Sequence, residues 1–152
     1  MTRVKVRDKI LNEAMLYDSY DVPSGERPED TAFKHFGSSQ YHWVILLTNN
    51  MTDSYYDWPL SEQDFESHIT DKYTNPDAIH HYEITQSSGP QTGSGPDDYT
   101  HKIEVNSDTV GAQSVSNREY EQRLQDDKRS IKLLSPNYLQ TLIEEFNNLV
   151  GN

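Results

Sequence analysis

The sequence predicts an α+β fold, in which a strand–helix–helix–strand module precedes a β-hairpin and C-terminal helices. Three observations carry this prediction. Short alternating segments indicate strands, capping boxes and first-position prolines indicate helices, and the stretch from Pro136 has the strongest amphipathic helical pattern in the chain. A length of 152 residues favours one core, with room for a satellite subdomain at most.

The apolar content and net charge of the sequence indicate which kinds of partner to expect. Hydrophobic residues make up 33% of the chain and the mean hydropathy is -0.90, so the core is modest and we expect partners to complete part of the apolar contact. The 25 acidic and 13 basic residues give a formal net charge of -12. A field of that sign repels phosphate backbones, so we expect no nucleic-acid ligand.

Cysteine is absent, which excludes disulfides, thiolate nucleophiles and thiolate metal sites together and fits a reducing cytoplasm. The first ten residues lack the apolar run of a signal peptide, and no later window approaches the ~20 apolar residues of a membrane span. We therefore expect a soluble chain without a targeting segment or a membrane partner.

Residues 1–19 are expected to form an N-terminal arm. Arg3, Lys5 and Arg7 alternate with two valines, which is typical of a half-buried edge strand, although a helix beginning at Asp8 fits as well. A basic arm on an acidic protein can dock against an acidic neighbour, or can simply be a solvated face.

Residues 20–60 are expected to form the compact module. A strand over Leu16–Val22 ends at a Pro-Ser-Gly turn, a helix follows over 28–37, and a second helix runs from a serine cap to Asn49-Asn50. The aromatic return segment Tyr55–Leu60 is then expected to pair with the first strand.

Residues 61–152 are expected to complete the fold. A capping box at Ser61 opens a third helix, and a β-hairpin follows whose tip is a mobile Gly/Pro-rich loop at 87–98. A second capping box at Ser116 opens a charged helix, and Ile131 begins a strand that leads into the final helix.

The aromatic residues from Tyr41 to Trp58 are the most distinctive feature. Trp43 lies in the middle of an apolar helix and is expected in the core. For Tyr55, Tyr56 and Trp58 the sequence leaves core packing and an exposed protein interface equally open.

The sequence contains little sign of reaction chemistry. His80 and His81 invite a metal hypothesis with His101, but adjacent strand residues point to opposite faces, so solvated histidines explain the pattern better. Hydrolase, zinc-protease, P-loop and dinucleotide motifs are missing. We therefore expect no enzyme activity, no catalytic, cofactor-binding or metal-ligating residues, and no small-molecule substrate.

Turn and helix-end residues within 20–60 carry a first resemblance. A turn glycine at Gly25, an Asp30-Thr31 pair, Phe36-Gly37 and Asn49-Asn50 fall in the order that resembles a LysM module. That resemblance implies binding of N-acetylglucosamine polymers such as peptidoglycan or chitin, which is the alternative function.

Four motifs carry a second resemblance: Arg27–Glu29 (Arg-Pro-Glu), Tyr41–Val44 (aromatic-x-Trp-Val), Tyr55–Trp58 (Tyr-Tyr-x-Trp) and the strand–helix ending from Ile131. Together they resemble the baseplate wedge protein 53 family of contractile-tailed, T4-like phages, which carries a LysM-like fold.

This second resemblance implies a structural virion protein of the phage tail baseplate, assembled in the host cytoplasm. It would bind other wedge proteins through protein–protein contacts and help join the wedges into a ring around the hub. The candidate interface residues are Tyr55, Tyr56, Trp58, Arg3, Lys5 and Arg7.

Overall fold

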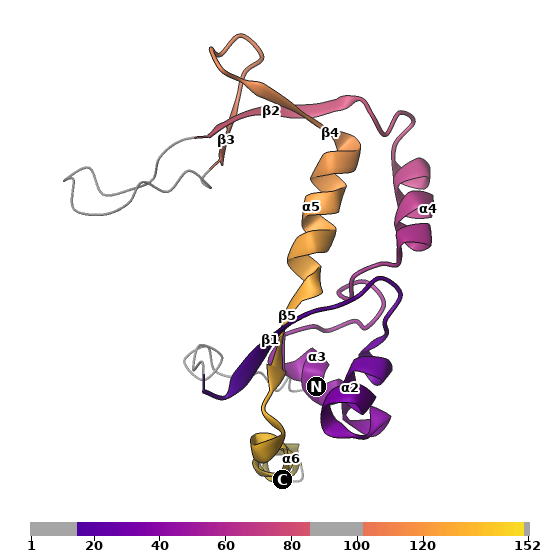
Figure 1. Ribbon diagram of the computed structural model, residues 1–152, viewed down its shortest axis with the longest axis vertical. Helices are drawn as coiled ribbons and strands as arrows, with labels where there is room; N and C mark the ends of the chain where they lie inside the picture. The colour runs from indigo at the N-terminus through magenta and orange to yellow at the C-terminus, as the bar shows by residue number, and fades with distance from the viewer. Residues whose placement is uncertain (1–14, 86–101, 151–152) are drawn as a thin grey trace, which may run out of the picture. The chain divides into compact units, whose positions relative to one another are not determined.

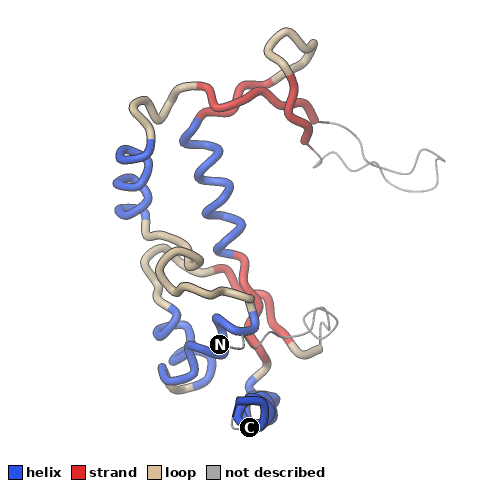
Figure 2. Tube along the Cα trace, turned by 180° about the vertical axis from the view of Figure 1, so that it is seen from behind, coloured by secondary structure: helices blue, strands red, loops and turns tan. Residues whose placement is uncertain are grey.

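The computed structural model describes residues 15–85 and 102–150, and its chain divides into two compact units. Unit 1 comprises residues 1–65 and 125–152, and unit 2 comprises residues 66–124. Helices and short antiparallel strands occur in both, which confirms the predicted α+β class (Figure 1; Figure 2).

Unit 1 is built from two strands and a set of short helices. Its elements are β1 (Tyr17–Asp21), α2 (Pro28–Phe36), the 3-10 turn η1 (Ser39–Tyr41), α3 (His42–Thr48), β5 (Ser130–Leu134), the 3-10 turn η2 (Pro136–Tyr138) and α6 (Leu139–Val150).

The ends of α2 follow directly from its sequence. Pro28 occupies the first turn, where its missing N–H costs no hydrogen bond, and the Arg27 N–H donates to the Asp30 carboxylate at 3.2 Å. Gly37 ends the helix with φ 79°, a left-handed conformation that favours glycine, and its N–H bonds the Phe33 carbonyl. The predicted helix over 28–37 is confirmed.

The strand pairing in unit 1 differs from the prediction. β1 pairs antiparallel with β5, from Tyr17 opposite Leu134 to Asp21 opposite Ser130. The expected strand over Tyr55–Leu60 is wrong, because this segment forms turns and a bend. The carboxylates of Asp57 and Asp53 accept backbone N–H groups in these turns, so those groups are not available for strand pairing. Pro59 has no N–H with which to form a strand hydrogen bond.

The side chain of Asn49 bonds the backbone of β5 at a position where a neighbouring strand would otherwise do so. Its side-chain amide donates to the Lys132 carbonyl at 2.8 Å, and its amide oxygen accepts the Lys132 N–H at 2.8 Å. Its N–H₂ also donates to the Ile45 carbonyl at the end of α3. One side chain therefore ties the end of the second helix to β5.

The core of unit 1 is apolar. Side chains from α2, α3, β5, the return segment and the residue that follows β1 meet in one cluster, formed by Val22, Ala32, Ile45, Trp58, Ile131 and Leu133. A second cluster lies under α6 and contains Tyr17, Val44 and Leu134.

Unit 2 holds a small three-stranded sheet with the order β3-β2-β4. Its strands are β2 (Ile79–Thr85), β3 (Lys102–Val105) and β4 (Gln113–Ser116), and α4 (Glu62–Lys72) and α5 (Asn117–Arg129) each begin in one unit and end in the other.

The predicted hairpin is confirmed, because Tyr82 lies opposite Val105 and Ile84 opposite Ile103. The loop at 87–98 lies outside the described residues. β4 was not predicted, since its sequence Gln-Ser-Val-Ser gives one apolar residue and no turn signal.

Candidate interaction surface

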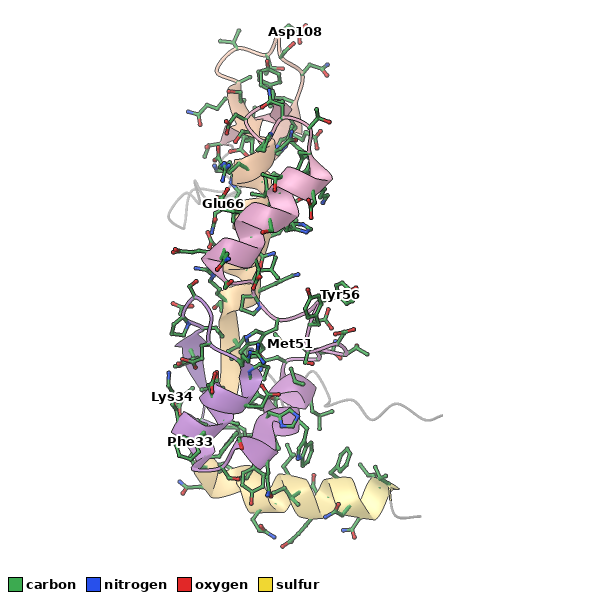
Figure 3. The ribbon with its side chains drawn as sticks, turned by 90° about the vertical axis from the view of Figure 1, so that its right-hand side faces the viewer. Phe33, Lys34, Met51, Tyr56, Glu66 and Asp108 are labelled. Atoms are coloured by element: carbon green, nitrogen blue, oxygen red, sulfur yellow. The ribbon has the colours of Figure 1, made fainter. Side chains whose placement is uncertain are left out.

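Tyr55 and Tyr56 form an exposed aromatic pair in unit 1. Their side chains are 72% and 71% exposed, and their rings meet edge to face with centroids 5.2 Å apart. Figure 3 shows Tyr56 projecting away from the ribbon. Two large rings presented together to solvent are typical of the anchor residues of a protein interface.

The turn that carries this pair is fixed by two aspartates. The Asp53 carboxylate accepts the N–H groups of Tyr55 and Tyr56 at 2.7 and 3.3 Å. The Asp57 carboxylate accepts the N–H groups of Thr52 and Asp53 at 2.7 and 3.0 Å. Carboxylates that cap turn N–H groups restrict the backbone, so the rings are presented on a preorganised loop.

Lys128 connects the same turn to α5. Its ammonium donates to the Tyr56 carbonyl at 2.8 Å. Beside this contact lies a cleft of about 510 Å³, lined by polar and charged groups and by two apolar side chains: Asn49, Asn50, Met51, Thr52, Asp57, Asp127, Lys128, Ser130 and Ile131. The tyrosine pair and this cleft together give unit 1 a surface with both aromatic anchors and polar groups.

Trp58 is part of the core instead of this surface. It is 5% exposed, lies in the apolar cluster with Ile45 and Ile131, and donates its indole N–H to the Glu26 carbonyl at 2.7 Å. Of the three aromatic residues left open by the sequence, only Tyr55 and Tyr56 are placed where a partner can reach them.

The side chain of Glu26 joins β1 and α2 of unit 1. Its buried carboxylate accepts the Tyr20 hydroxyl at 2.8 Å and the Thr31 hydroxyl at 2.6 Å, and it pairs with the Lys34 ammonium. Burial alone would raise the pKa of Glu26, but the bonds from Lys34, Thr31 and Tyr20 outweigh burial and lower it. The carboxylate therefore stays charged and holds β1 against α2.

A second cleft lies beside α2. Its volume is about 680 Å³, and its lining includes Phe33, which is 63% exposed, together with Glu26, Asp30 and Ser24. Phe33 and Lys34 lie on the opposite side of unit 1 from Tyr56 in Figure 3. Glu26, Asp30 and Ser24 already bond to protein groups, so much of the polar lining is engaged within the chain.

The candidate residues Arg3, Lys5 and Arg7 of the arm lie outside the described residues, as does His101. His80 and His81 do not point to opposite faces of the strand as predicted. A β-bulge between Ile79 and His81 lets the two rings meet, with Nδ1 of His80 2.8 Å from Nδ1 of His81. The ring of His80 also stacks on Tyr120.

Over residues 15–85 and 102–150, no group of three or more histidine or carboxylate side chains is arranged to hold a metal ion. Among the same described residues, none of the helices has the length and apolar character that crossing a membrane requires.

No pattern in the sequence identified Glu26 or Asn49 as residues that organise unit 1. Both are polar residues next to turns, where their types are common, and their roles depend on contacts with distant segments. The exposed position of Tyr55 and Tyr56 had one usable signal, the two aspartates around them, because Asp favours turns over strands.

The family model described as Base plate wedge protein 53 matches residues 6–89, which are 84 of the 152 residues. The match includes β1, α2, α3, α4, β2 and the Tyr55–Tyr56 turn.

A curated relative, the Baseplate wedge protein gp53 of Enterobacteria phage T4, is 33% identical over 57 residues. This alignment covers 38% of the chain and 29% of the relative. Because the family model covers more than half of the sequence, the chain belongs to the Base plate wedge protein 53 family.

Proposed function

We propose that this chain is a structural, non-catalytic component of the phage tail baseplate wedge. It binds other wedge proteins and helps to join adjacent wedges into the ring around the hub, after assembly in the host cytoplasm. Membership of the family supports this role, and the exposed Tyr55–Tyr56 pair is the observation that supports a specific contact site.

The tyrosine pair fits a protein partner for three physical reasons. Its rings supply a large contact area with few rotatable bonds. The aspartate-capped turn reduces the ordering cost of binding. The acidic side chains around it, Asp53, Asp57 and Asp127, favour a partner that brings arginine or lysine to the ring faces, where cation–π contacts form.

The test is Tyr55→Ala combined with Tyr56→Ala, in the full chain co-expressed with the other wedge proteins of its phage. Because both rings are exposed, we expect a folded protein with an unchanged melting temperature. Loss of two interface anchors at about 2 kcal/mol each predicts a fall in wedge affinity of roughly several hundred-fold. Native mass spectrometry and sedimentation measure the assembled fraction.

Tyr138→Ala is the matched control, since Tyr138 is another exposed tyrosine of unit 1, at 44%, and lies at the start of the C-terminal helix region. We expect it to assemble as the parent chain does. Normal wedge assembly by the double variant would refute the tyrosine pair as a contact site.

The LysM resemblance stays a prediction, and with it the carbohydrate-binding alternative. The cleft beside α2 pairs an exposed aromatic ring with carboxylates, a composition that can bind a sugar, but its engaged polar groups argue against this role. Retention of the purified chain on peptidoglycan, abolished by Phe33→Ala and unchanged by the tyrosine double variant, would favour the alternative.

A further inference from the structure

The C-terminal helix α6 is covered along only part of its apolar face. Leu139 and Leu142 pack against the cluster of Tyr17, Val44 and Leu134. One turn further on, the ring of Phe146 lies 4.8 Å from the ring of Trp43, measured between centroids. These contacts anchor the first part of α6 to unit 1, and Figure 3 shows the helix running along its base.

The last turn of α6 presents uncovered apolar side chains. Leu149 and Val150 are 67% and 57% exposed. The helix carries Glu144 and Glu145 but no lysine or arginine, and its last turn has no basic residue to complement the negative end of the helix dipole. This end of α6 is therefore both apolar and negatively polarised.

The chain enters β1 beside the beginning of α6. The Ser135 N–H donates to the Leu16 carbonyl at 2.8 Å, and Tyr17 lies opposite Leu134. Leu16 also packs against the same cluster as Leu139 and Leu142. A segment attached before Met15 is therefore tethered by a short length of chain to a point beside α6, and this tether raises its effective concentration at that surface.

The segment 3–11 combines basic and apolar residues, which complement the acidic and apolar end of α6. It reads Arg-Val-Lys-Val-Arg-Asp-Lys-Ile-Leu, with four cations and four apolar residues among its nine. We propose that the exposed apolar end of α6 is the docking site of the chain's own segment 3–11. The apolar residues of this segment cover Leu149 and Val150, and its cations pair with Glu144, Glu145 and the helix C-terminus.

The distances permit this contact within one chain. The ten residue steps from Leu139 to Leu149 correspond to about 15 Å of helix at ~1.5 Å per residue. An extended chain covers ~3.3 Å per residue, so about five residues upstream of Leu16 are enough to reach the end of α6. The acidic neighbour of the arm is then α6, and this docking does not depend on the proposed baseplate function.

Because the sequence contains no cysteine, two introduced cysteines can form a disulfide only with each other or between two copies of the chain. Asn12→Cys combined with Asn148→Cys places one thiol at the end of the segment and one on α6. Under mild oxidation of the full chain we expect an intramolecular disulfide, seen on non-reducing gels, to form at least about tenfold faster than in a control pair. The control combines Asn12→Cys with Ser54→Cys, which lies on the exposed turn of unit 1.

Charge reversal tests the pairing itself. In the Asn12→Cys/Asn148→Cys background, Arg7→Glu with Lys9→Glu is expected to slow disulfide formation several-fold. Adding Glu144→Lys and Glu145→Lys is expected to restore it. Equal rates in the two cysteine pairs, a predominantly covalent dimer, or charge reversal without effect would each overturn the proposal, the dimer showing instead that the segment docks on a second copy.

Discussion

The two units of the molecule are stabilised in different ways. Unit 1 buries apolar side chains from five segments around Trp58 and Ile45. Among the described residues of unit 2, the buried apolar side chains are Ile69 and Val115, and two buried carboxylates accompany them. A chain with a modest apolar content thus concentrates its hydrophobic residues in one unit and relies on ion pairs in the other.

The two buried carboxylates of unit 2 are engaged by cations and by a tyrosine hydroxyl. Glu83 accepts two bonds from the Arg123 guanidinium at 2.7 and 2.9 Å and one from Lys102 at 2.6 Å. Glu121 accepts the Lys72 ammonium at 2.6 Å and the Tyr73 hydroxyl at 2.7 Å. Such networks fix geometry, but their stability depends on the charge state of the carboxylate.

The largest expected effect is on the apolar unit. Trp58→Ala removes a buried ring and leaves a cavity, so we expect a loss of about 3 to 5 kcal/mol in the free energy of unfolding. Urea unfolding followed by the fluorescence of Trp43, the one tryptophan left, measures this loss. Trp58→Phe keeps an aromatic ring but loses the bond to the Glu26 carbonyl, and should cost less.

Hydrogen exchange in Trp58→Ala sharpens the comparison. Amides of β1 and β5 should lose protection first, because the ring packs between these strands and the helices. An unchanged melting temperature would contradict the core position of Trp58 and return this residue to the candidate interface.

Acid should act more strongly on unit 2 than on unit 1, because the pKa of Glu83 is lowered further than that of Glu26. Hydrogen bonds from Arg123 lower the pKa of Glu83 from its ordinary 4.5 to about 2, with burial opposing them and Lys102 adding to them. Because the folded pKa lies below the unfolded value, the stabilisation is complete above about pH 4.5 and is lost as the pH falls toward 2. Hydrogen exchange of the β2 amides, measured from about pH 6 to about pH 2.5, follows the loss of this stabilisation.

Glu83→Gln is the control for this acid effect. It should cost about 1 to 3 kcal/mol at neutral pH, below the figure for a fully buried pair, because the Arg123 and Lys102 side chains are 36% and 42% exposed. It should also flatten the pH dependence of β2 protection. A variant that keeps the full acid sensitivity would show that other carboxylates control the stability of unit 2.

Local signals in the sequence predicted most elements but not their partners. Pro28 and Gly37 fix the ends of α2, and Ser61 caps α4, because its hydroxyl accepts the Asp64 N–H and donates to the Asp64 carboxylate. These features depend on neighbouring residues alone. The pairing of β1 with β5 joins the two ends of the chain, and no local pattern specifies it.

The candidate surface was predictable only in part, because the positions of its side chains also depend on contacts between distant segments. The sequence marked Tyr55, Tyr56 and Trp58 as one aromatic group, but the direction of each side chain depends on the turn that Asp53 and Asp57 close. Trp58 points inward because Glu26 and the apolar cluster receive it, and both come from segments distant in the sequence.

The smallest expected effect separates exposed from buried ion pairs within unit 2. Glu66 pairs with Arg118, and their side chains are 55% and 39% exposed. Water and salt screen such a pair, so Glu66→Gln should change the melting temperature by less than about 2 °C, and 0.5 M salt should remove the difference. Calorimetry of Glu66→Gln beside Glu83→Gln makes the comparison. Equal destabilisation by the two variants would mean that burial does not set the strength of these pairs, and that unit 2 is held by its total charge pattern instead of by its buried carboxylates.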